Sequence, residues 1–176
     1  MTVNEEIRTL ESLVKEKNAE VNNHRKARDS FQNEARACQM RRDSFHQTAR
    51  DLMKKVNELK KERDRYNAVV REAKENRQAL TDRINEAREN GVRDLSDMKR
   101  ERDAFHRQVV ENHAKAQSFH DQIDKVRDQI DAAKKLADEE HERSLQLREA
   151  GEAEHQKFVK CLKELEELQN ELPDTL

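Results

Sequence analysis

Five histidines recur along the second half of the chain, and imidazole can bind a metal ion or transfer a proton near neutral pH. Each follows a position of one hydrophobic ladder, on a stripe that also carries Lys99, Arg127, Lys134 and Arg148; the histidines are His106, His113, His120, His141 and His155. Heptad spacing separates helical residues by about 10 Å, whereas chelation on a helix needs a spacing of three or four residues. We therefore predict no metal site and interpret the stripe as the flank of a helix–helix seam. A pH response near 6 remains a second hypothesis, because histidine titrates there.

A second recurring pattern, Arg-Asp-x-aromatic, begins at Arg28, Arg42, Arg63 and Arg102. It is either a repeated binding motif or a packing unit. Every aromatic residue of the pattern falls on the hydrophobic ladder, which favours a packing unit whose arginine stem covers the seam while its head reaches water. The sequence contains no glycine-rich phosphate loop, no nucleophile–base pair and no pair of carboxylates in a pocket. We therefore predict no catalytic residue, no cofactor and no enzymatic activity.

The composition determines which elements can position these side chains. The chain has 176 residues, of which 42% are charged and 3% aromatic, with one proline and two glycines. Such a balance is typical of disorder or of a long heptad helix, and the scarcity of proline and glycine favours the helix. The two cysteines, Cys38 and Cys161, lack the spacing of a zinc site or a disulfide framework. Because no apolar stretch resembles a membrane span or a signal peptide, we expect a cytoplasmic protein without a membrane partner.

Two heptad ladders predict two helical arms, residues 2–89 and 95–172. In the first arm one ladder position (a) runs from Ile7 to Ile84 and the other (d) from Val3 to Ala87. In the second arm a runs from Leu95 to Leu172 and d from Met98 to Leu168. Thr2 and Glu5 fit a capping box at the start of the first arm. Pro173 ends the second arm and leaves a tail, 173–176.

Between the arms the ladder step changes from 7 residues to 11. A stutter in one continuous helix would explain this change, and so would a turn. Local chemistry favours a turn over residues 90–94. Asn90-Gly91 suits a helix C-cap with Gly91 in the left-handed conformation, and Val92 is placed to make the accompanying hydrophobic contact. Asp94 can then cap the next helix.

An antiparallel hairpin fixes the pairing of the whole seam, because residues equally distant from Gly91 must face each other. This register places large residues opposite small ones, as even packing requires, and it predicts two core ion pairs, Arg28–Glu154 and Arg42–Glu140. A parallel homodimer would instead bring like charges together in the seam, which is costly. We therefore predict an all-α fold, a long antiparallel two-helix coiled-coil hairpin that turns at Asn90-Gly91.

Residues 24–65 carry 13 lysines and arginines against 7 acidic residues, which makes them the best candidate for contact with RNA phosphates. The densest part holds Lys54, Lys55, Lys60 and Lys61. The alternative is that these cations pair with the opposite arm, where residues 117–158 carry 7 basic and 11 acidic residues.

The Arg-Asp-x-aromatic units make the chain similar to archaeal coiled-coil proteins built on Arg-Asp-x-Leu/Phe-Asn/His repeats, which often carry a phosphoserine phosphatase label. Two segments carry the resemblance: Arg63-Asp64-Arg65-Tyr66-Asn67 and Ala153-Glu154-His155-Gln156-Lys157-Phe158-Val159. The label would imply aspartate-nucleophile motifs on an α/β fold, and this sequence has neither. More distantly, the chain resembles eukaryotic coiled-coil proteins that associate with ribosomes and messenger ribonucleoprotein.

These expectations define a non-enzymatic interaction or spacer protein. The resemblance implies a ribosome or RNA as its partner, while the sequence itself identifies no protein partner. The alternative is a structural protein that associates with itself as a parallel dimer or a bundle.

Overall fold

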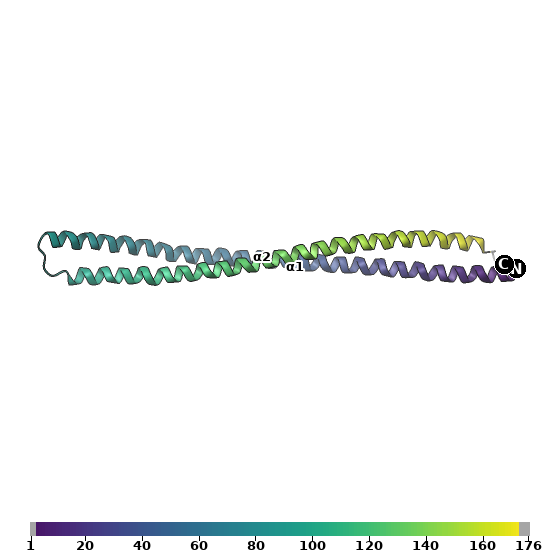
Figure 1. Cartoon of the computed structure of the whole chain (residues 1–176), viewed down its shortest axis with the longest axis horizontal. Coiled ribbons are helices and arrows are strands. Elements are labelled where there is room, and N and C mark those ends of the chain that lie inside the picture. Colours follow the sequence, from purple (N-terminus) through teal and green to yellow (C-terminus); the bar gives the residue numbers. More distant parts are fainter. Residues whose placement is uncertain (1–2, 173–176) are drawn as a thin grey trace. The chain divides into compact units, whose positions relative to one another are not determined.

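The computed structural model describes residues 3–172 of the chain and contains two long helices, α1 (Val3–Glu89) and α2 (Ser96–Glu171). The helices run in opposite directions from a short connection (Figure 1), so the prediction of an all-α helical hairpin is confirmed. Thr2, Pro173 and the tail 173–176 lie outside the described residues. Over residues 3–172, neither helix has a stretch that is both long and apolar enough to span a membrane.

The length of α1 follows from its residues. Neither glycine nor proline occurs between Val3 and Glu89, so nothing in that stretch disfavours the helical backbone. Glu5 and Glu6 lie in the first turn and Arg88 in the last, which matches the direction of the helix dipole. Ion pairs three or four residues apart, such as Lys17–Glu20 at 2.7 Å, add small increments of helical stability along the exposed face.

The helix α1 ends in the cap that Asn90-Gly91 predicts. Gly91 has a φ of 77°, a left-handed conformation that strains any residue with a Cβ. Its N–H donates to the Arg88 carbonyl at 3.0 Å, and the Val92 N–H donates to the Ala87 carbonyl at 2.9 Å. This pair of bonds is a Schellman motif, which satisfies carbonyls that the helix leaves unpaired. Val92 contributes its backbone, while its side chain is 48% exposed.

Asp94 caps the start of α2, as predicted. Its Oδ1 accepts a hydrogen bond from the Ser96 N–H at 3.0 Å and another from the Ser96 hydroxyl. These two bonds lower the pKa of Asp94, the hydroxyl bond having the larger effect. The Leu95 carbonyl accepts the first helical bond, from the Lys99 N–H at 3.0 Å. The helix α2 thus begins at Ser96, one residue later than the sequence pattern indicates.

The described residues fall into two compact units, which we describe separately. The turn unit comprises residues 47–134, and the terminal unit comprises residues 3–46 of α1 with 135–172 of α2. In both units every buried residue lies on an a or d position of the predicted ladders. The heptad phase predicted for each arm therefore agrees with the observed burial.

The turn unit has the larger apolar cluster. Ile123 is fully buried and lies at the centre of a group with partly buried Leu52 and Leu59 around it; the other buried members are Ala49, Val56, Val126, Ile130 and Ala133. A second cluster nearer the turn joins Phe105 to Val70, Ala73 and Val109. Tyr66 and Phe119 stack with their ring centroids 5.7 Å apart.

In the terminal unit, small residues let the helices approach closely. An added Cβ on Gly151 would lie 3.5 Å from the Cβ of Phe31, which is ordinary contact between a large residue and a small one. Cys38 and Ser144 are 1% and 2% exposed, and the Ser144 hydroxyl donates to the Ala35 carbonyl at 3.3 Å. Val21, Cys161 and Leu165 form the apolar cluster of this unit.

Candidate functional site

The two predicted core ion pairs, Arg28–Glu154 and Arg42–Glu140, are wrong. Each arginine instead forks onto the aspartate that follows it. Nε and Nη2 of Arg28 donate to Oδ1 of Asp29 at 2.9 and 2.6 Å, and Arg42 binds Asp43 in the same way. An adjacent aspartate keeps the guanidinium near water, whereas a pair inside the seam would lose the hydration of both charges. Arg28 also lies over the Phe158 ring, 5.0 Å from its centroid.

The two seam glutamates pair with other residues than the predicted arginines. Glu140 receives two bonds of 2.9 Å from Arg41, and these bonds are the main reason that its pKa is lowered. Glu154 lies 2.7 Å from both Lys157 and the His24 ring. Lys157 first, and then His24, lowers the pKa of Glu154. The sequence therefore identified seam charges correctly but not their partners.

The Arg-Asp fork is a property of the seam. It forms in all four Arg-Asp-x-aromatic units, including Arg63–Asp64 and Arg102–Asp103. Arg50-Asp51 and Arg127-Asp128 lie off the ladders and form no such fork, because Arg50 donates to Gln47 and Arg127 to Asp124. This contrast supports the interpretation of the pattern as a packing unit.

Two histidines of α2 lie beside seam arginines of α1. Nδ1 of His106 lies 3.1 Å from Nη1 of Arg77, and Nδ1 of His141 lies 3.5 Å from Nη1 of Arg42. An arginine can only donate, so the imidazole nitrogen is the acceptor in each contact. Throughout residues 3–172, no three metal-binding side chains gather at one point. The stripe thus flanks the seam, as interpreted from the sequence.

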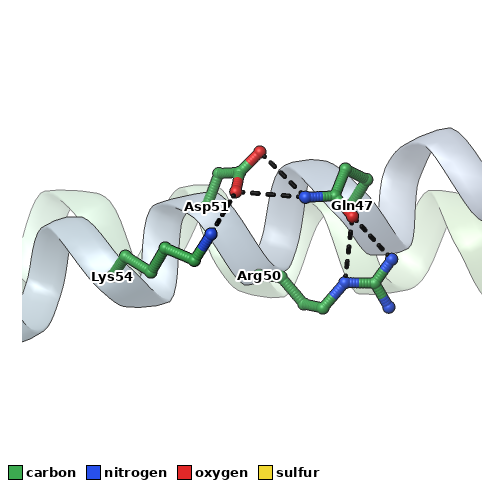
Figure 2. Close-up of polar contacts among 4 residues, drawn as sticks. All are labelled: Gln47, Arg50, Asp51 and Lys54. Atoms are coloured by element: carbon green, nitrogen blue, oxygen red, sulfur yellow. Dashed lines mark hydrogen bonds and ion pairs between the residues drawn. The ribbon is translucent and has the colours of Figure 1, made fainter.

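The four lysines predicted to contact RNA do not form one surface. Lys54 donates to Asp51 at 3.2 Å, within a network along α1 that Gln47 and Arg50 complete (Figure 2). The Gln47 amide and Lys54 together lower the pKa of Asp51. Lys55 and Lys61 lie on a surface around Leu59 that also carries Glu58 and Glu62. Only Lys60 joins cations from the other helix.

Lys60 lines a groove of about 300 Å³ between the helices of the turn unit, which we call the basic groove. Arg127 and Lys134 of α2 also line it, and Met53, Val56 and Ile130 supply apolar surface; Asn57 and Asp131 complete the lining. Three cationic side chains and one carboxylate, that of Asp131, thus line the groove. Arg127 also lies 3.4 Å from Asp124 outside the lining. The groove therefore keeps a positive balance on a partly apolar surface.

Pairing between helices differs between the two units. In the terminal unit Lys17 binds Glu164 at 2.9 Å, and the His24–Glu154 and Arg41–Glu140 contacts also join α1 to α2. Within residues 47–134, no lysine or arginine of one helix pairs with a carboxylate of the other. The predicted alternative, that basic residues pair with the opposite arm, thus holds for Arg41 and not for Lys60.

Sequence reasoning missed Arg127 and Lys134 as groove residues, although a signal was present. Both belong to the set of residues that directly follow d positions, which we call the e flank. In the turn unit the e flank contains no aspartate or glutamate; it comprises Met53, Lys60, Asn67, Lys74, Thr81, Arg88, Lys99, His106, His113, His120, Arg127 and Lys134. The absence of acidic residues from the e flank of both arms would have identified this side of the seam as the basic one.

Comparison of the chain with protein families, with curated proteins and with solved structures gives no match. The functional argument therefore rests on the chain's own surfaces.

Proposed function

We propose that this protein is a non-enzymatic coiled-coil interaction and spacer module that contacts RNA phosphates through the basic groove. The observation that carries the proposal is the meeting of Lys60, Arg127 and Lys134 in one groove without a carboxylate partner across the seam. The cytoplasmic location expected from the sequence, and the ribosomal or ribonucleoprotein context that the resemblance implies, belong to the same proposal.

The chemistry of the groove suits a phosphate backbone more than a defined base sequence. Lysine and arginine neutralise phosphates and release counterions, which gives affinity that falls steeply with salt. Contacts to phosphates position a nucleic acid but carry little sequence information. Met53 and Ile130 offer apolar surface beside the cations, and an unstacked base or sugar can cover such surface. We therefore expect single-stranded RNA to bind with weak sequence preference.

The test compares two triple charge reversals in the turn unit. Lys60→Glu/Arg127→Glu/Lys134→Glu changes the groove, and Lys55→Glu/Lys61→Glu/Lys125→Glu changes three exposed lysines outside it. Fluorescence anisotropy with a labelled single-stranded RNA measures affinity across a salt series. The groove variant should lose at least about tenfold in affinity and reduce the salt slope by about 2, the value for three phosphate contacts to a single strand.

The control variant should stay within about threefold of the unmodified protein, because it carries the same change in net charge away from the groove. Equal losses in both variants would show that net charge alone attracts RNA. An unmodified protein that does not bind RNA at low salt would contradict the proposal.

Self-association is the second candidate function. Leu145 of the terminal unit is 43% exposed and lies among Glu142, Glu149 and Glu152. Light scattering of the purified chain separates the two candidates, since a concentration-dependent dimer or larger species without RNA affinity would favour self-assembly.

A further inference from the structure

A second, smaller groove lies on the same e flank of the turn unit. It has a volume of about 230 Å³, and we call it the Arg63 notch. Arg63 and Asn67 line it from α1, and Ala116 is the lining residue of α2 that is buried in the seam; His113, Gln117 and His120 complete the lining. No carboxylate lines the notch.

Arg63 lacks a histidine contact that two other seam arginines, Arg42 and Arg77, make. Nε and Nη2 of Arg63 both donate to Oδ1 of Asp64, at 2.9 and 2.7 Å. Nη1 of Arg42 lies 3.5 Å from Nδ1 of His141, and Nη1 of Arg77 lies 3.1 Å from Nδ1 of His106. Nη1 of Arg28 and Nη1 of Arg102 make no such contact within residues 3–172. Among the described residues, Nη1 of Arg63 has no such partner.

At Arg63 the histidine in the equivalent position of the register is His120, and its ring contacts Asp124 instead of the arginine. Its Nε2 lies 3.7 Å from Oδ2 of Asp124, on the outer side of α2. The notch opens between Arg63 and the His120 ring. At Arg42 and Arg77 an arginine–histidine contact exists at the equivalent place. Asp64 holds the guanidinium plane in place, so the unused donor at Arg63 is already oriented.

We propose that the Arg63 notch binds one oxyanion, a phosphate of the RNA strand that occupies the basic groove. This inference rests on the proposed function. Nη1 of Arg63, the Asn67 amide and the histidine ring N–H groups supply the donors, and arginine binds phosphate through such charge-assisted bonds. The alanine floor leaves room for the anion. Lys60 and Arg63 are three residues apart on α1, so the two grooves can serve neighbouring parts of one strand.

The notch gives RNA binding a pH dependence that the basic groove lacks. Lysine and arginine keep their charge between pH 6 and 7.5, whereas imidazole is the side chain of a physiological-pH switch. Arg63 of α1 lines the notch with His113 and His120, Asp64 binds Arg63, and Asp124 of α2 lies 3.7 Å from His120. By sequence position, Lys60 and Lys74 of α1 and Asp121 and Arg127 of α2 are further charged residues along the two helices. A bound phosphate adds negative charge beside these histidines. Proton uptake and RNA binding therefore strengthen each other.

The main test measures RNA affinity at pH 7.5 and 6.0 at constant salt. The unmodified protein should bind about five- to tenfold more tightly at the lower pH, the size of a typical coupling between two sites. His113→Gln/His120→Gln should abolish this gain. The control His46→Gln/His155→Gln removes two histidines of the terminal unit and should keep it. Circular dichroism at both pH values verifies that each variant is folded.

A second pair of variants tests the notch without changing a histidine. Asn67→Asp places a carboxylate in the notch and should weaken RNA binding about threefold at pH 7.5, the loss expected for one phosphate contact. Asn76→Asp makes the same change on the other side of α1, where affinity should not change. Salt-sensitive binding with no pH dependence and no effect of Asn67→Asp would overturn the notch and leave the basic groove intact. Failure to bind RNA at either pH would overturn both.

Discussion

The terminal unit and the turn unit share one heptad pattern but use their charged side chains differently. In the terminal unit Lys17, His24 and Arg41 of α1 contact carboxylates of α2. In the turn unit the described seam is joined by apolar packing around Ile123, and within residues 47–134 no lysine or arginine pairs with a carboxylate across it. The comparison indicates that flanking cations remain available for a ligand where the seam is apolar and well packed. Where the seam contains carboxylates, the flanking cations pair with them.

The difference follows from the seam residues themselves. The a and d positions of the turn unit supply Val56, Ile123, Val126 and Ile130 in direct contact. The terminal unit instead has Glu140 and Glu154 on its ladder, and a partly buried carboxylate needs a hydrogen-bonding partner. We therefore expect the stability of the turn unit to depend most on packing and the stability of the terminal unit to depend most on pH.

The largest expected effect comes from Ile123→Ala, which would remove a fully buried side chain from the apolar cluster of the turn unit. The free energy of unfolding, measured by urea titration with circular dichroism, should fall by about 2–5 kcal/mol. Val110→Ala on the same helix changes a side chain that is 56% exposed and should have little effect. Equal losses from both substitutions would mean that the apolar cluster does not dominate this unit.

The second-largest effect comes from replacing each of the two glycines with alanine, which allows the change in stability to be compared between the units. Gly91→Ala forces a Cβ onto a residue with a φ of 77° and should destabilise the turn unit by about 1–2 kcal/mol. Gly151→Ala in the terminal unit places its Cβ at ordinary contact distance within a helix and should stabilise it by up to about 1 kcal/mol. Opposite signs in thermal melts are the expected result. Destabilisation by Gly151→Ala would show that the packing against Phe31 is tighter than described.

The smallest effect concerns Glu140 and acid. Arg41 lowers the pKa of Glu140 in the folded chain, so the unfolded chain binds the proton more readily. The stabilisation is then fully present above the ordinary glutamate pKa of about 4.3 and is lost as the pH falls through the folded value. Glu140→Gln should lower the Tm by about 1–3 °C at pH 7 and reduce the loss of stability between pH 5 and 3. The neighbouring Glu139→Gln serves as the control, and an identical acid profile in both variants would contradict the role of the Arg41 contact.

The turn and the register were predictable because they depend on short-range and periodic signals. Asn90-Gly91 requires a left-handed cap whatever surrounds it, and every later layer follows from the distance to Gly91. The predicted limits of α2 differ from the observed ones by one residue at each end. At Ser96, Asp94 caps from just outside the helix.

The charged contacts were not predictable from the register alone. A long side chain such as Arg28 or Arg42 can reach several partners from one backbone position, and the nearest aspartate requires the least desolvation. The repeated Arg-Asp dipeptide was the signal for the fork. Likewise, the density of lysines in the sequence led to Lys54 and Lys55, whereas the groove depends on which side of the helix each cation occupies.

The equal spacing of partners about Gly91 also constrains how such a gene can change in length. Deletion of seven codons from one arm would keep the heptad phase of that arm but shift every layer farther from the turn against its partner. A matching deletion at the mirrored place in the other arm would restore those layers. Insertions and deletions in this chain should therefore persist in compensating pairs, so that the two arms keep equal lengths.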